Sequence, residues 1–240
     1  APTNTAFSSF LSDNGFASLD DVPVATLREI LLNHVVEGTN LSSNLTTGYI
    51  KTLGKGSASN SNTLSMYVNT SSGVRLNGVA NVISADVMAS NGVVHVVDAV
   101  IGLPTIVTHA TANPNFSTLT SLLVAQGLVP TLSGTTSSPF TVFAPVNSAF
   151  SQPVLDLYGS LSSDAKSQVL TYHVVSGVNV RSNAIPSGNI ATVQGQGFTI
   201  TGTSINDAGS TVNKNIILTD VQCSNGVVHA IDGVLLPSFN

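Results

Sequence analysis

The five residues Asn-Gly-Val-Val-His at positions 91–95 recur unchanged at positions 225–229, and this repeat constrains the fold more than any other feature of the sequence. Each copy lies within a longer similarity, which runs from Asp86 to Asp98 in the first copy and from Asp220 to Asp232 in the second. The copies are too far apart for a solenoid, whose repeats are roughly 20–50 residues long. The repeat therefore predicts a duplicated domain within the chain of 240 residues.

The composition favours a protein of the extracellular space. Charged residues make up 8% of the chain, against about 25% in an average soluble protein, so solubility rests on the Ser, Thr, Asn and Gly residues between apolar runs. The formal net charge is −5 and the seven Lys and Arg residues form no basic cluster, which argues against nucleic acid as a partner. The longest apolar run, Val93 to Leu103, is too short for a transmembrane helix, which needs roughly 20 apolar residues.

Each copy combines helices with β-strands, which predicts two α+β domains, 1–104 and 105–240. Apolar residues at every third or fourth position predict a helix between Pro23 and Gly38 and its counterpart between Ser162 and Gly177. The repeated segment is expected to form the last strand of each domain, and its valines suggest burial on both faces. The other expected strands are 48–55, 62–68 and 73–79 in the first copy, and 189–193, 197–203 and 215–220 in the second.

The two copies begin differently. The opening segment Ala1–Phe7 matches Ala144–Phe150, but in the second copy this motif follows a β-rich run, Phe140–Phe143, and a helical pattern. We therefore expect the first domain to lack the N-terminal helices and first strand, which correspond to roughly Thr105–Phe143, and the second domain to be complete. Either an N-terminal part precedes Ala1, or another element completes the first domain; if Ala1 is the true N-terminus, this domain is expected to expose a strand edge and an apolar groove.

The second copy resembles a fasciclin (FAS1) domain from end to end. The resemblance is carried by Phe-Thr-Val-Phe-Ala-Pro-Val-Asn-Ser-Ala-Phe at 140–150, by the pair Tyr172-His173, and by Asn-Gly-Val-Val-His-Ala-Ile-Asp at 225–232. The first copy is similar from Ala1 to Pro104. The chain thus looks like a tandem pair of FAS1 domains. The resemblance implies that each is a wedge of β-sheet with flanking helices, secreted or displayed on a cell surface, which works in adhesion without catalysis.

The resemblance also implies residues that contact a partner. In animal members of the family, integrin contacts are associated with the Tyr-His region, here Tyr172 and His173, and with a segment of the Asn-Lys-Asp-Ile-Leu type. Because integrin-type recognition relies on a carboxylate that reaches a metal, the replacement of that acidic residue by Asn215 argues against an integrin as the partner. The matching segment consists of Asn213, Lys214, Asn215, Ile216 and Ile217.

Four of the five histidines are paired between the copies. The pairs are His34 with His173 and His95 with His229. Residues three apart on a strand point to opposite faces, so neither His95 with Asp98 nor His229 with Asp232 can chelate one ion. We expect a structural motif instead, in which buried imidazoles hydrogen-bond to the backbone where the helix meets the last strand.

No catalytic residue, cofactor or metal site is expected. The sequence has no Gly-x-Ser-x-Gly nucleophile elbow, and the segment Gly48–Gly56 lacks the spacing of a phosphate loop. The single cysteine, Cys223, is matched by Ala89, which favours a buried structural residue over a reactive thiol. His109 is expected on the exposed side of a helix. The glycosylation triplets that begin at Asn40, Asn44, Asn69 and Asn115 are attributed to the composition.

Three functions remain open on this basis. The first is a non-enzymatic, secreted or cell-surface adhesion module that contacts cells, extracellular matrix, a biofilm or a polysaccharide. The second is a structural subunit of a homopolymeric filament or swapped oligomer, formed through the incomplete first domain, because exposed strand edges attract strands from other chains. The third is a carbohydrate or small-ligand binder that uses the loops between Gly188 and Asn213, where Phe198 is the only aromatic residue.

Overall fold

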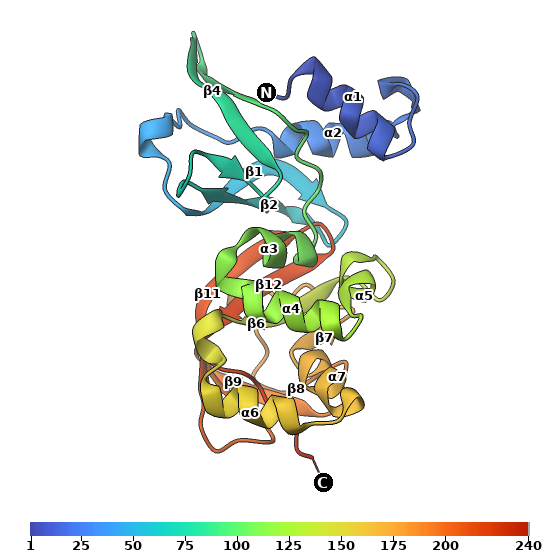
Figure 1. Ribbon diagram of the computed structural model, residues 1–240, viewed down its shortest axis with the longest axis vertical. Helices are drawn as coiled ribbons and strands as arrows, with labels where there is room; N and C mark the ends of the chain where they lie inside the picture. The colour runs from blue at the N-terminus through green and yellow to red at the C-terminus, as the bar shows by residue number, and fades with distance from the viewer. Residues whose placement is uncertain (240) are drawn as a thin grey trace. The chain divides into compact units, whose positions relative to one another are not determined.

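The computed structural model describes residues 1–239, and the chain divides into two compact units, Ala1–Pro104 (unit 1) and Thr105–Asn240 (unit 2). Both units combine helices with a β-sheet (Figure 1), which confirms the predicted α+β class.

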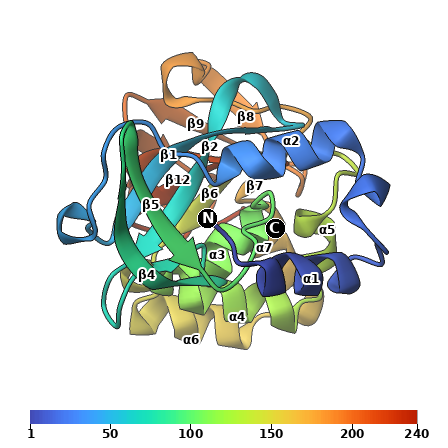
Figure 2. The ribbon, with the colours of Figure 1, turned by 90° about the horizontal axis from the view of Figure 1, so that it is seen from above.

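Unit 1 is an antiparallel sheet with a helix packed along its first strand. Its elements are α1 (Asn4–Asp13), η1 (Leu19–Asp21), α2 (Val24–Asn33), η2 (Ser42–Asn44), β1 (Gly48–Gly56), β2 (Ser59–Asn69), β3 (Arg75–Leu76), β4 (Ala80–Ala89) and β5 (Gly92–Val97). The strand order is β1-β2-β3-β4-β5, and α2 contacts β1. Figure 2 shows the β4–β5 hairpin on one side of the N-terminus and the helices α1 and α2 on the other.

Local sequence explains where these elements begin and how they approach each other. The Thr3 side chain accepts a hydrogen bond from the Ala6 amide at 3.1 Å and so starts α1. Gly54 brings β1 against α2, because a Cβ at this position would lie 2.8 Å from the backbone nitrogen of Asn33. The core of the sheet consists of Met66, Ala80, Val97 and Ile101, all of them buried.

In unit 2, helices both precede and follow the first strand along the chain. Its helices are α3 (Ile106–Ala112), η3 (Pro114–Phe116), α4 (Ser117–Ala125), α5 (Val129–Ser133), η4 (Asn147–Ala149), α6 (Gln152–Ser160), α7 (Ser163–Thr171) and η5 (Ser182–Ala184). Its strands are β6 (Phe140–Pro145), β7 (Val174–Ser176), β8 (Gly188–Ala191), β9 (Gly197–Thr201), β10 (Ser204–Asn206), β11 (Lys214–Cys223) and β12 (Gly226–Ile231). The strand order is β7-β6-β12-β11-β10-β9-β8.

Strand β6 is the centre of unit 2. It runs parallel to β12, with Phe140 opposite Gly226 and Pro145 opposite Ile231, and antiparallel to β7 on its other edge. All its residues are buried, because α3, α4 and α5 cover one face of β6 and β12 (Figure 1). The core on the other face includes Phe143, which meets Phe198 edge-to-face with ring centroids 5.2 Å apart.

The structure corrects several expectations about individual elements. The last strand is buried on both faces in unit 2, but in unit 1 only Val97 of β5 is fully buried, because the described chain of unit 1 has no counterpart of β6 and of α3–α5. His109 is buried rather than exposed, since α3 turns it toward the sheet. The predicted strand 73–79 is reduced to the short β3, and the long β4 that follows it was not predicted.

Candidate functional site

The strands β4 and β11 carry the same irregularity at matching positions. The pairing of β4 with β5 shifts between Val82 and Ser84, and that of β11 with β12 shifts between Ile216 and Leu218. The residue inside each shift, Ile83 or Ile217, is a β-bulge, which turns a side chain away from the regular sheet face. The two isoleucines are 58% and 54% exposed. Each unit therefore presents one large apolar side chain to solvent by the same device.

A bidentate contact fixes the strand just before each bulge. In unit 2, Asp232 accepts hydrogen bonds from the Asn215 backbone amide at 2.6 Å and from its side-chain amide at 2.9 Å. In unit 1, Asp98 accepts the same pair from Asn81 at 2.7 and 2.8 Å. The Asn81 side-chain hydrogen bond, followed by the backbone bond, lowers the pKa of Asp98. These carboxylates are therefore held within the fold beside the bulge.

The predicted partner segment, residues 213–217, contains both exposed and buried side chains. Lys214 is buried, because its Nζ lies 2.7 Å from Oδ2 of Asp207 and also donates to the Val212 carbonyl. Ile216 is buried in the core of unit 2. The residues that face solvent alternate with them along the strand, as the strand period requires. The exposed set consists of Asn213, Asn215 and Ile217.

Tyr172 and His173 lie inside unit 2, at the C-terminal end of α7. The Tyr172 hydroxyl donates to the Gly197 carbonyl at 2.7 Å and accepts from the Ala208 amide at 3.1 Å. Neither side chain lies on the surface, so neither is placed to touch a partner directly. Both side chains lie in the core and not beside the exposed residues Asn213, Asn215 and Ile217. Direct contact with a partner stays a prediction for these three exposed residues.

His34 and His173 make equivalent contacts in the two units. Nδ1 of His173 lies 2.8 Å from the Val169 carbonyl, and Nε2 accepts from the Leu235 amide at 2.8 Å. His34 bonds in the same way to Ile30 and Ile101. This arrangement needs a neutral ring with its proton on Nδ1. Burial, which is complete for His173, lowers its pKa to about 4.

His95 and His229 contact a second irregularity in β4 and β11, which lies at Asp86 and Asp220. Nε2 of His229 lies 2.8 Å from the Val180 carbonyl, and its Nδ1 is 3.4 Å from the Asp220 amide. Asp220 has a positive φ of 63°, and the matching Asp86 has a φ of 59°. Burial is the main cause that lowers the pKa of His229. His95 makes the corresponding contacts with Asn40 and Asp86.

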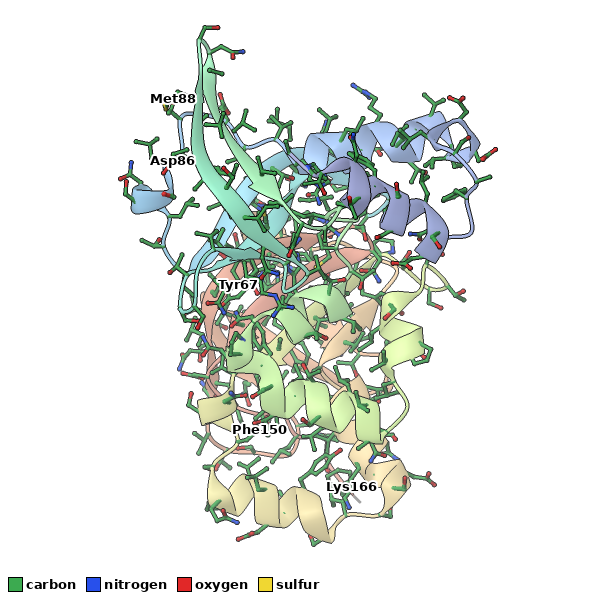
Figure 3. All side chains as sticks on the ribbon, turned by 45° about the horizontal axis from the view of Figure 1, so that its top comes forward. Tyr67, Asp86, Met88, Phe150 and Lys166 are labelled. Carbon is green, nitrogen blue, oxygen red and sulfur yellow. The ribbon has the colours of Figure 1, made fainter. Side chains whose placement is uncertain are left out.

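The carboxylates of Asp86 and Asp220 tie these turns to short helices. Asp220 accepts from the Ser182 amide at 2.9 Å and from its hydroxyl at 2.6 Å, at the start of η5. Asp86 accepts the same two bonds from Ser42, at the start of η2. Figure 3 shows Asp86 on β4, below Met88 on the projecting hairpin. Both aspartates therefore work as caps, which is a structural use.

The family model for the fasciclin domain matches residues 1–104 and 114–237, which together are nearly the whole chain. The chain belongs to the fasciclin domain family. Both units carry the match, which agrees with the duplicated hydrogen-bond pattern of their last strands.

Bacterial fasciclin relatives match over about the length of one unit. Protein sll1483 of Synechocystis is 41% identical over 138 residues, which are 55% of this chain and 73% of the relative. Immunogenic protein MPB70 of Mycobacterium bovis is 35% identical over 135 residues, 53% of this chain and 66% of the relative. Cell surface glycolipoprotein MPB83 of the same species is 37% identical over 142 residues, 55% of this chain and 60% of the relative.

A solved fasciclin pair has the same fold. It is the FAS1 domain pair from the insect cell adhesion molecule fasciclin I, with a TM-score of 0.54 and 22% sequence identity. The similarity covers 98% of this chain and 87% of that chain. At this identity the likeness supports the architecture of two fasciclin domains in tandem.

Among residues 1–239, the His, Cys, Asp and Glu side chains do not gather in groups of three that could hold a metal ion. No helix in this same range combines the length and the apolar character that crossing a membrane requires.

The two bulged isoleucines were not predicted from the sequence as a duplicated feature. A signal was present, because Asn81-Val82-Ile83 and Asn215-Ile216-Ile217 both place two apolar residues in a row after an asparagine. Two adjacent apolar residues break the alternation of a half-buried strand, and a bulge restores it. The same pattern in both copies could have identified the bulge before the structure.

Proposed function

We propose that this fasciclin chain is a non-enzymatic adhesion module that works outside the cell or at its surface. The observation that carries the proposal is the duplicated bulge that exposes Ile83 and Ile217. Family membership supports it, as do the names of two similar proteins, a cell surface glycolipoprotein and an insect cell adhesion molecule. Two copies of one contact in a single chain would raise the apparent affinity for a surface through multivalency.

The chemistry of the bulge favours an apolar and amide contact. Ile217 is flanked by the exposed side chains of Asn213, Asn215 and Leu218, so the surface offers hydrocarbon with neutral donors and acceptors. The Asp232 carboxylate beside the bulge accepts both hydrogen bonds from Asn215, so it is not presented as a ligand for a partner's metal. This surface suits a neutral protein or polysaccharide of a matrix or biofilm better than a metal-dependent receptor.

The test is surface binding by matched variants. The purified chain is incubated with cells, with immobilised matrix proteins and with polysaccharides, and the bound amount is measured. We expect the double variant Ile83→Ser/Ile217→Ser to lose most binding, because truncation of a central apolar contact costs more than about 1 kcal/mol at a hot spot. Val124→Ser is the control, since Val124 is 62% exposed and belongs to the helix α4 and not to a bulged strand.

Two results would contradict this function. Absence of binding to every surface by the wild-type chain would remove the adhesion role. Equal losses in the bulge variant and in Val124→Ser would show that binding follows general surface hydrophobicity and not the bulges. Circular dichroism of all variants checks that the fold is kept, which is expected because substitutions of exposed side chains change the free energy of unfolding by about 0.5 kcal/mol or less.

A further inference from the structure

Unit 2 has a long loop at a position where unit 1 has a tight turn. In unit 1, three residues (77–79) connect the last paired residue of β3 to the first of β4. In unit 2, eight residues (206–213) connect the equivalent pair, Ile205 and Lys214. The loop 206–213 is therefore an addition to the fold that the two units share, and loops on a common scaffold often carry recognition.

A buried ion pair closes the base of this loop. Nζ of Lys214 lies 2.7 Å from Oδ2 of Asp207, and the two side chains are only 10% and 0% exposed. Unit 1 has Ala80 in place of Lys214, and its turn, Asn-Gly-Val, contains no charged residue. Loss of one partner of a buried pair is costly, because the other charge is left uncompensated. The pair therefore holds the two ends of the loop together.

Further hydrogen bonds order the rest of the loop. The Gly209 amide donates to the Leu236 carbonyl at 2.8 Å. The Lys214 ammonium group also donates to the Val212 carbonyl at 2.7 Å, and the Ser210 hydroxyl accepts from the Val212 amide at 3.1 Å. The loop is thus ordered before any partner binds, which reduces the entropy that binding costs.

The tip of the loop is exposed and uncharged. Val212 is 69% exposed, which is more than either bulged isoleucine. Its neighbours Thr211 and Asn213 are also exposed, and the chain continues from them into the exposed Asn215 of β11. The core of a protein interface is depleted of charged side chains, and this tip meets that condition.

We propose that the loop 206–213 is the recognition element of unit 2 and inserts Val212 into an apolar, uncharged pocket of a protein partner. This inference rests on the proposed adhesion role and names the class of its partner. It also makes the two units unequal binders, because unit 1 has only a three-residue turn at this position.

The choice of a protein over a polysaccharide follows from the side chains. The segment 206–223 contains no aromatic residue on which a sugar ring could stack. A projecting valine needs a cavity to enter, and a folded protein offers apolar cavities of that kind. The ion pair contributes no net charge to the loop, so a strongly charged partner gains nothing from it.

The experiment uses the cells and immobilised matrix proteins of the adhesion test. Binding of the 240-residue chain is measured on untreated cells, on cells treated with proteinase K to remove surface proteins, and on cells whose sugars are oxidised with periodate. We expect binding to survive periodate and to be lost after proteinase K. Val212→Ser should weaken binding about fivefold or more, because serine buries less apolar surface. Val79→Ser is the matched control, since Val79 is a 49% exposed valine in the equivalent turn of unit 1, and it should bind like the wild type.

The role of the ion pair is tested by a measurement that needs no partner. Lys214→Met leaves Asp207 unpaired, so the Gly209 amide should exchange with solvent about tenfold faster or more, and binding should weaken as in Val212→Ser. Lys214→Arg keeps the positive charge and should recover most of both. If Lys214→Met does not fold, Asp207→Asn/Lys214→Met removes both charges without an unpaired one, and the same two changes are expected.

The contrary results are distinct. Equal binding of Val212→Ser and the wild type would overturn the loop as recognition element and leave adhesion through the bulges intact. Binding that resists proteinase K and is lost after periodate would overturn the protein partner and identify a polysaccharide. Wild-type binding by Lys214→Met, despite faster Gly209 exchange, would overturn the positioning role of the ion pair. Absence of all binding would contradict the adhesion role itself, and this inference with it.

Discussion

Unit 1 and unit 2 place the same five residues in different surroundings. Val94 in unit 1 is 38% exposed and Val228 in unit 2 is 4% exposed; for the preceding strand, Val87 is 48% exposed and Val221 is 2% exposed. The difference comes from β6 and the helices α3–α5, which within residues 1–239 cover these positions in unit 2 and have no equivalent over unit 1. Burial of a strand is therefore set by segments distant in sequence, even where the local sequence is identical.

Other features are the same in both units. Asp86 and Asp220 both adopt a positive φ, and each caps a short helix through a serine. His34 and His173 both connect a carbonyl one helical turn back to an amide of the final loop. These contacts persist without the covering segments of unit 2. Local polar geometry is thus determined by nearby residues, whereas apolar burial depends on the whole unit.

The largest expected effect is that of Phe143→Ala, because this residue of β6 has no counterpart in the described part of unit 1. Its ring packs against Phe198 and stacks on His229 at a centroid distance of 5.5 Å. Loss of a buried Phe side chain typically costs 3–5 kcal/mol, so the free energy of unfolding of unit 2 should fall by about that amount. Urea unfolding followed residue by residue with NMR should show unit 1 unchanged. A parallel loss of stability in unit 1 would show that the two units do not unfold independently.

The pH dependence of stability should differ between the paired histidines. His173 has a folded pKa of about 4 against about 6.5 when unfolded, so below pH 6.5 the unfolded chain takes up a proton that the folded chain does not. The contribution is complete above about pH 6.5 and falls by about 3 kcal/mol as the pH drops to about 4.

The pKa of His34 is also lowered, chiefly by burial, but His34 is only half-buried and should titrate at a higher pH than His173. NMR titration of the two ring C2 protons measures the order. If His173 titrated at the same pH as His34 or at a higher pH, the deeper burial of His173 would have no electrostatic consequence.

The smallest of the three effects is that of one methyl group at the matched glycines. Gly226→Ala should lower the free energy of unfolding of unit 2 by about 1–3 kcal/mol, because the new Cβ overlaps the Phe140 backbone. Gly92→Ala should be neutral or stabilise unit 1 by up to about 1 kcal/mol, since alanine restricts the unfolded chain. Thermal unfolding of the two variants side by side gives the sign of each change. A loss of stability with Gly92→Ala would mean that another segment lies against Gly92 in solution.

Much of this fold could be predicted, because the duplication identified equivalent elements twice. The helix after Pro23 and the helix after Ser162 lie where the apolar spacing and the caps placed them, as α2 and α7. Strand β4 was missed because its two register shifts, one at Ile83 and one that includes Asp86, destroy the period of two that marks a strand. The parallel pairing of β6 with β12 joins segments about eighty residues apart, and no local pattern encodes that register.

The candidate site was predicted only in part, because the sequence does not state which side chains of a strand face solvent. The 213–217 segment was chosen by resemblance, and the alternation of buried and exposed residues within it depends on the register set by the bulge. The burial of Lys214 depends on Asp207, which lies on the far side of a turn. Such pairs become visible only when the tertiary contacts are known.

The single cysteine makes it possible to measure the opening of unit 2 alone. Cys223 is fully buried at the end of β11, and its counterpart in unit 1 is Ala89, so the chain holds one thiol and that thiol lies in one unit. A small alkylating reagent can reach the sulfur only while this unit is open. When closing is faster than alkylation, the labelling rate equals the intrinsic rate multiplied by the open fraction. Native-state labelling therefore measures the free energy of opening of unit 2 without any denaturant, and unit 1 contributes nothing to the signal.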